Sequence, residues 1–86
     1  MTLLYILKFD QKAIETLEKL PKEISLRIWT KLQEAKLNPF RYFVRLKGRQ
    51  DYKLRVGDWR ALANIKQNDR VIEITKVGHR RNVYKD

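Results

Sequence analysis

A short hairpin in the middle of the chain restricts the fold more than any other segment. Residues 52–62 read YKLRVGDWRAL, two strand-like runs that meet at the dipeptide Gly57-Asp58. Glycine readily adopts the positive φ that a two-residue hairpin turn requires. The turn then fixes the register of the two strands, and this register places Arg55 directly opposite Arg60.

Side chains alternate between the two faces of such a hairpin, so one face is apolar and the other is basic. Like charges directly opposite each other destabilise a sheet by roughly 0.2–1 kcal/mol per pair. An arginine pair at this position therefore indicates an anion-binding site rather than a need of the fold. The apolar face carries Tyr52, Leu54, Val56, Trp59, Ala61 and Ala63, and the basic face carries Lys53, Arg55 and Arg60 beside Leu62.

The whole chain of 86 residues predicts a single α+β domain. A strand is expected over 2–9, helices over 11–19 and 21–37, and three more strands over 51–56, 59–66 and 70–77. Asp10 is a good N-cap for the first helix, and Pro21 ends it and opens the second. The order β-α-α-β-β-β predicts an antiparallel-dominated four-stranded sheet with a helical hairpin packed on one face.

Apolar residues at helical spacing predict which sides of the helices are buried. The expected buried positions are Ile14, Leu17 and Leu20 in the first helix and Ile24, Ile28, Leu32 and Ala35 in the second, with Leu26 and Trp29 beside them. Residues 40–50 are expected to form a connector anchored by Phe40, Phe43, Val44 and Leu46.

Charge is distributed unevenly along the chain. The net charge is +10, of which residues 40–86 carry +8, including eight arginines. A field of this sign attracts nucleic acid, acidic proteins or anionic membranes, and arginine suits bidentate phosphate contacts. The apolar run Leu3–Leu7 is too short to span a bilayer, so we expect no membrane segment and a cytoplasmic location.

Several kinds of chemistry are missing from the sequence. There is no cysteine and only one histidine, so neither a thiolate nor a multi-histidine metal site can form. The single serine, Ser25, falls within a helix, which argues against a serine triad. No glycine-rich phosphate loop is present, and we expect neither a metal nor another cofactor.

The basic tail after Gly78 supplies the remaining candidate residues. We expect Gly78 to end the last strand, so that the tail curls back onto the basic face of the sheet. It would bring His79, Arg80, Arg81 and Tyr84 to that face, where an imidazole or a phenol could transfer protons and arginine could stabilise developing charge.

These residues resemble the RelE/ParE superfamily. The likeness lies in the element order, in RLKG at 45–48, in YKLRVGDWR at 52–60 and in VGHRRNVY at 77–84. It covers essentially the whole chain and is greatest with RelE, the toxin of a type II toxin–antitoxin pair. The resemblance implies an endoribonuclease that cuts mRNA in the ribosomal A site without a metal, by attack of a ribose 2′-OH on the adjacent phosphate.

The resemblance also implies roles for individual residues. Lys53 or Tyr84 would remove the proton, and Arg60 and Arg80 would stabilise the transition state. A basic residue would protonate the 5′-oxygen. His79 stands where many RelE proteins have lysine, so it is a further catalytic candidate. The implied catalytic set is Lys53, Arg55, Arg60, His79, Arg80 and Tyr84, and the residues expected to contact mRNA and ribosomal RNA are Arg45, Lys47, Arg49, Arg81 and Lys85.

Two other functions remain open at this point. ParE-like members of the superfamily poison DNA gyrase, although they tend to lack the complete set of basic residues and tyrosine. A non-catalytic RNA- or ribosome-binding module would use the same basic face. In the toxin interpretation, the expected protein partner is a RelB-like antitoxin, acidic or amphipathic, that covers this face.

Overall fold

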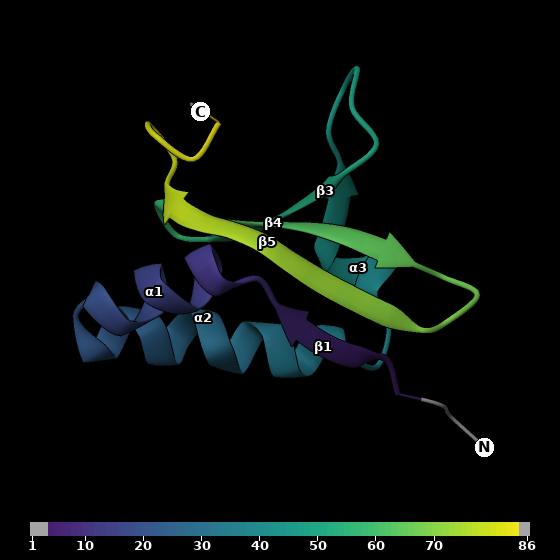
Figure 1. Cartoon of the computed structure of the whole chain (residues 1–86), viewed down its shortest axis with the longest axis horizontal. Coiled ribbons are helices and arrows are strands. Elements are labelled where there is room, and N and C mark those ends of the chain that lie inside the picture. Colours follow the sequence, from purple (N-terminus) through teal and green to yellow (C-terminus); the bar gives the residue numbers. More distant parts are fainter. Residues whose placement is uncertain (1–3, 85–86) are drawn as a thin grey trace.

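The computed structural model describes residues 4–84 as three helices and five strands (Figure 1). The helices are α1 (Gln11–Lys19), α2 (Lys22–Ala35) and the short α3 (Pro39–Tyr42). The strands are β1 (Ile6–Phe9), β2 (Phe43–Arg45), β3 (Tyr52–Val56), β4 (Trp59–Lys66) and β5 (Val71–His79). No helix within residues 4–84 is long and apolar enough to cross a membrane.

The strands form one mixed sheet in the order β1-β5-β4-β3-β2. Strands β2, β3, β4 and β5 pair in turn as antiparallel neighbours, and β1 pairs with β5 in parallel at the far edge. A parallel neighbour requires a crossover connection, which here contains both long helices. The α+β class and the antiparallel-dominated sheet are as predicted.

Helices α1 and α2 cover one face of the sheet, which leaves the other face open (Figure 1). The core between the layers is built from apolar side chains of α2 and of the three central strands. Its fully buried members include Ile28, Leu32, Leu54, Ile72 and Ile74. The side of the sheet opposite α1 and α2 is called the open face.

Residues 40–50 contain more regular structure than the connector we expected. Phe43, Val44 and Arg45 pair with Leu54, Lys53 and Tyr52, so β2 is a fifth strand. Of the expected anchors, Phe43 is buried, but Phe40 and Val44 are exposed. The run is too short to show alternation by itself, and it becomes a strand because β3 offers it a hydrogen-bonding edge.

Several other details of the elements differ from those expected. The first strand begins at Ile6, and the part expected at residues 2 and 3 lies outside the described residues. Helix α2 ends at Ala35, and Asp10 occupies the N-cap of α1 without a side-chain capping hydrogen bond. In α1 the buried residue is Ala13, whereas Ile14 is exposed.

Candidate functional site

The β3–β4 hairpin has the register that the Gly57-Asp58 turn predicts. Arg55 pairs with Arg60, and Val56 pairs with Trp59 across the turn. Gly57 has a φ of 58°, a left-handed conformation that strongly favours glycine. The arginine pair therefore lies on the open face, because Leu54 and Ala61, which alternate with it, belong to the core.

The two paired arginines have very different surroundings. Arg55 is exposed, whereas Arg60 is only 9% exposed. The Nη1 of Arg60 donates hydrogen bonds to the carbonyl oxygens of Gly57 at 2.8 Å and Trp59 at 2.9 Å. We expected both guanidinium groups to face a ligand. Instead Arg60 is folded against the hairpin turn, where two carbonyl dipoles stabilise its charge, and Arg55 alone extends into solvent.

A β-bulge in β5 determines which face receives the end of that strand. Leu62 pairs with Lys76 while Ala63 pairs with Ile74, so Thr75 is an extra residue between two pairs. The Thr75 hydroxyl donates to the Leu62 carbonyl at 3.3 Å. One extra residue reverses the alternation that follows it, which turns residue 77 toward the helices and residue 78 toward the open face.

His79 consequently does not lie on the open face, and that expectation is wrong. The strand continues through Gly78 to His79, which pairs with Trp59. The imidazole meets the Trp59 ring edge-on, with 5.4 Å between the ring centroids. Its Nδ1 accepts a hydrogen bond from the Arg81 backbone N–H at 3.3 Å. His79 is thus a half-buried packing residue on the helix side.

The segment after β5, residues 80–84, does fold back over the open face as predicted. The Arg80 N–H donates to the Asp58 carbonyl at 2.8 Å, and the Val83 N–H donates to the His79 carbonyl at 2.9 Å. Val83 is 1% exposed and lies against Gly78, which pairs with Arg60 on the open face. We call residues 80–84 the C-terminal strap.

The strap presents its candidate side chains to solvent. Arg80, Arg81 and Tyr84 are exposed, and the Nε of Arg80 lies 3.8 Å from Oδ1 of Asp58 at the hairpin turn. Lys85, which we expected to bind RNA, lies outside the described residues. The strap thus brings the guanidinium of Arg80 beside the hairpin that carries Arg55 and Arg60.

A second group of cations lies at the end of β2 and in the loop between β2 and β3. Arg45, Lys47 and Arg49 are exposed and line a depression of about 460 Å³. Arg49 forms an ion pair of 2.7 Å with Asp51, and Nε of Arg45 donates to the Arg49 carbonyl at 3.3 Å. This loop and the strap both rise from the side of the sheet away from α1 and α2, and they flank the open face (Figure 1).

The structure adds basic residues that we did not predict from the sequence. A cleft of about 620 Å³ lies between α1 and the strands β4 and β5 and reaches the loop at Arg49. Leu62 and Thr75 form part of its lining, and its cations are Lys12, Lys19, Arg49 and Lys76, with Glu15 among them. The positions of Lys12 and Lys19 on one side of a helix were visible in the sequence, but the sequence did not show that this side faces the sheet.

Residues 4–84 contain no group of three or more histidine and carboxylate side chains arranged to hold one metal ion.

Comparison with known proteins agrees with this fold. The family model described as the ParE toxin of the type II toxin–antitoxin system parDE matches residues 7–84. A search of curated proteins finds no match to this chain.

Solved structures of RelE toxins share the architecture. The RelBE2 toxin–antitoxin complex from Mycobacterium tuberculosis matches with a TM-score of 0.79 at 24% identity, over 90% of this chain and 99% of that one. The archaeal RelE–RelB complex from Pyrococcus horikoshii OT3 also gives 0.79 at 24% identity, over 94% and 100%. The intact E. coli RelBE complex gives 0.76 at 24% identity, over 87% and 95%.

The fold and the basic open face define a toxin domain of the RelE/ParE superfamily. Because the family model covers nearly the whole chain, this protein belongs to the ParE toxin family of type II toxin–antitoxin systems.

Proposed function

We propose that this toxin is an endoribonuclease that cleaves mRNA in the A site of the ribosome. The observation that most supports the proposal is that the strap packs on the open face. The strap, which carries Arg80 and Tyr84, packs through Val83 on the side of the sheet that presents Lys53 and Arg55. A ribonuclease needs a base, an acid and fixed positive charge around one phosphodiester, and these side chains can supply all three.

The proposed reaction is an internal transfer of the phosphoryl group. The ribose 2′-oxygen loses its proton to Tyr84 or Lys53 and attacks the adjacent phosphorus. The bond from phosphorus to the 5′-oxygen breaks, and that oxygen takes a proton from a cationic side chain. The products are a 2′,3′-cyclic phosphate and a free 5′-hydroxyl, so atoms and charges balance without a further reactant.

The surroundings of the arginines refine the proposed roles. Arg55 and Arg80 are exposed and can contact the phosphate directly. Arg60 holds two backbone carbonyls of the hairpin, so its proposed role is to support the hairpin and add positive field beneath the phosphate. His79 faces the helices and is left out of the proton transfer.

RNA on either side of the cleaved bond would follow the cations that flank the open face. On one flank, Arg45 ends β2 and Lys47 and Arg49 lie in the loop that follows it, and Arg81 lies in the strap on the other flank. We propose that these residues, together with the cleft lined by Lys12 and Lys19, contact mRNA and ribosomal RNA.

A RelB-like antitoxin is the proposed protein partner, and the cytoplasm is the proposed location. The three similar RelE structures are complexes with such an antitoxin. A net charge of +10 favours an acidic partner, and covering the open face would block access of RNA to it.

The experiment that tests the proposal uses purified ribosomes programmed with a defined mRNA. The expected result is cleavage within the A-site codon, with a 2′,3′-cyclic phosphate on the upstream fragment. Lys53→Met and Arg80→Met variants should cleave more slowly. Intact mRNA after prolonged incubation with folded protein would overturn the proposal.

Inhibition of DNA gyrase is the second candidate, because the matching family model is that of the ParE toxin. A supercoiling assay with purified gyrase distinguishes the two functions. Loss of supercoiling together with intact ribosomal mRNA would establish the second candidate. Salt-dependent RNA binding with neither activity would leave a non-catalytic RNA-binding module.

A further inference from the structure

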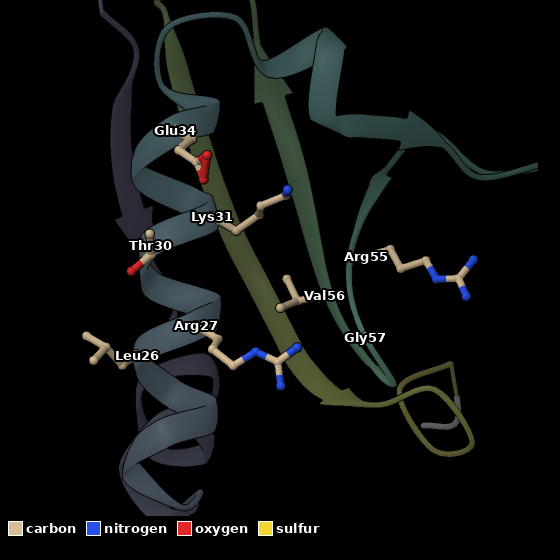
Figure 2. Close-up of a pocket in the computed structure, with 8 residues that line it drawn as sticks. All are labelled: Leu26, Arg27, Thr30, Lys31, Glu34, Arg55, Val56 and Gly57. Atoms are coloured by element: carbon tan, nitrogen blue, oxygen red, sulfur yellow. The ribbon is translucent and has the colours of Figure 1, made fainter.

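The turn of the β3–β4 hairpin is surrounded by arginine side chains. Arg27 of α2 approaches it across a groove of about 470 Å³, and its Nη2 would lie 3.5 Å from a Cβ atom on Gly57 (Figure 2). Arg55 lies at the rim of this groove and points away from α2 (Figure 2). Arg60 is folded against the turn, and Arg80 lies beside the turn at the start of the strap. Positive charges gathered around one turn repel one another, so a nearby carboxylate would stabilise the group.

Asp58 supplies that carboxylate, and it contacts Arg80 at two points. The carbonyl oxygen of Asp58 accepts a hydrogen bond from the Arg80 N–H at 2.8 Å. The side-chain Oδ1 of Asp58 lies 3.8 Å from the Nε of Arg80. Within the described residues, the other three arginines around the turn form no ion pair. The contact with Asp58 therefore distinguishes Arg80 from the other arginines of the group.

The hairpin turn does not itself require an aspartate at residue 58. A two-residue turn can be formed with a positive φ at its first central residue alone, and Gly57 has this conformation. Asp58 does not have a positive φ, so its backbone suits many residue types. The carboxylate is therefore not explained by the turn.

The stability of the fold does not explain the carboxylate either. The side chains of Arg80 and Asp58 are 51% and 65% exposed, and an ion pair between side chains this exposed contributes little to folding. What the pair does affect is the direction in which the long side chain of Arg80 points.

The geometry of the pair determines which part of Arg80 remains free. A guanidinium is a planar fork of five N–H donors, and it can bind an anion through Nε and one Nη or through both Nη groups. The Asp58 carboxylate lies at the Nε of Arg80. The edge formed by the two Nη groups is therefore available for a second anion.

We propose that Asp58 is a positioning residue, which orients Arg80 so that its two Nη groups meet the phosphate during mRNA cleavage. The reaction is taken from the proposed function, on which this inference rests, and the orientation is taken from the two contacts between Asp58 and Arg80. A guanidinium that is already oriented stabilises the charge of the transition state without first being ordered. Asp58 itself does not touch the RNA and acts through Arg80.

This role predicts opposite effects of Asp58 on RNA binding and on cleavage. The carboxylate places a negative charge near the phosphate, which weakens binding. It also orients Arg80, which speeds the chemical step. Replacing a residue needed only for folding would impair both binding and cleavage, and replacing one that acts only through its charge would improve both.

The first test compares Asp58→Asn with the parent on ribosomes programmed with a defined mRNA. We expect kcat to fall about ten- to a hundredfold, with a KM that is unchanged or up to about threefold lower. Asp58→Glu should recover most of kcat, because its carboxylate can still reach Arg80. The charge-matched control is Asp69→Asn, which removes an exposed carboxylate beyond the opposite end of β4 and should keep both constants within about twofold. A higher KM with unchanged kcat in Asp58→Asn would overturn the proposal.

The second test asks whether Asp58 acts through Arg80. In an Arg80→Met background, Asp58→Asn should lower kcat by less than about a further twofold, because no guanidinium remains to be oriented. A loss as large as the one that Asp58→Asn causes in the parent would overturn the proposal.

NMR of the free protein provides a third test, which does not depend on cleavage. Nitrogen-15 relaxation of the Arg80 Nε–H group should show more motion in Asp58→Asn than in the parent, and Asp58→Glu should resemble the parent. The Arg80 backbone N–H donates to the carbonyl of residue 58, so its exchange protection should be equal in all three proteins and verifies that the turn is intact. Equal motion of the Nε–H group in the parent and in Asp58→Asn would overturn the proposal.

These measurements separate the positioning role from the proposed ribonuclease function. Ordering of Arg80 by Asp58 in a protein that leaves mRNA intact would reject the ribonuclease and keep the orientation of Arg80. Cleavage by a protein in which Arg80 moves equally with and without the carboxylate would reject the positioning role and keep the ribonuclease.

Discussion

Val83 lies so close to Gly78 that a Cβ atom on residue 78 would be 3.4 Å from the Cβ of Val83. Through this contact the C-terminal strap packs against β5. Gly78 faces it only because the bulge at Thr75 reverses the alternation along β5. One inserted residue in a strand thus decides where the chain end, with Arg80 and Tyr84, is held.

Val83→Ala should release the strap while leaving the domain folded. The substitution removes about 1–2 kcal/mol of apolar burial from a segment held by few other contacts. We expect hydrogen-exchange protection of the residue 83 amide, which donates to His79, to fall about tenfold. Val44→Ala is the matched control, because Val44 is 61% exposed. Unchanged protection in Val83→Ala would mean that the strap is held by its backbone hydrogen bonds alone.

Gly78→Ala tests the same contact from the other side. A Cβ atom on residue 78 would lie in ordinary van der Waals contact with Val83, 3.4 Å from its Cβ and 3.5 Å from its Cα. We therefore expect the strap protection of Gly78→Ala to stay within about twofold of the parent, because the added methyl group displaces nothing. A large loss of protection in Gly78→Ala would contradict this contact distance.

Arg60→Met should destabilise the protein more than Arg55→Met, although the two arginines are paired. Replacing Arg60 removes two hydrogen bonds to hairpin carbonyls, and we expect a decrease of about 1–2 kcal/mol in the free energy of unfolding. Arg55 is exposed, and its replacement also removes a like charge, so we expect a change within about 0.5 kcal/mol. Urea unfolding measures both. Equal effects would show that the burial of Arg60 contributes nothing to stability.

Tyr84→Phe separates catalysis from binding. If the phenol takes the 2′-OH proton, its removal should slow A-site cleavage by about 10²- to 10⁴-fold. RNA affinity should change by less than about twofold, since the ring remains. Tyr42→Phe on the helix side serves as the control. A fully active Tyr84→Phe protein would assign proton removal to Lys53.

The loop cations should appear in the salt dependence of RNA binding. Removing a side chain that neutralises one phosphate of a single strand reduces the slope of log K against log salt by about 0.7. We expect this reduction for Lys47→Gln, whose side chain is exposed on the flank of the open face. Lys22→Gln, at the start of α2, should leave the slope unchanged. A parallel decrease in both variants would indicate a response to net charge alone.

Local sequence signals predicted the parts of the fold that depend on neighbouring residues. The Gly57-Asp58 turn set the register of Arg55 and Arg60, because two strands joined by a two-residue turn can pair in only one register. Pro21 separated the two helices as expected. Strand β2 was not predicted, because three residues are too few to show the alternation of a strand. Its pairing with β3 is a contact between separate segments of the chain.

In the candidate site, too, features set by neighbouring residues were predicted and features set by the tertiary structure were not. The basic face of the hairpin followed from alternation. The return of the strap was also predicted, but Gly78 does not end the strand as expected, because β5 continues to His79. The position of His79 was not predicted, because strict alternation ignores the bulge at Thr75. The burial of Arg60 was also hidden, since carbonyl oxygens that accept its hydrogen bonds become available only when the turn has formed.

The sequence alone determined which residues carry positive charge, which strand face they share and where the chain turns, since these properties depend on residue type and near neighbours. Tertiary structure decided which of those charges meet solvent, which side His79 occupies and how α2 meets the hairpin to form a groove. These features depend on packing between distant segments, where one bulge or one buried valine changes the result.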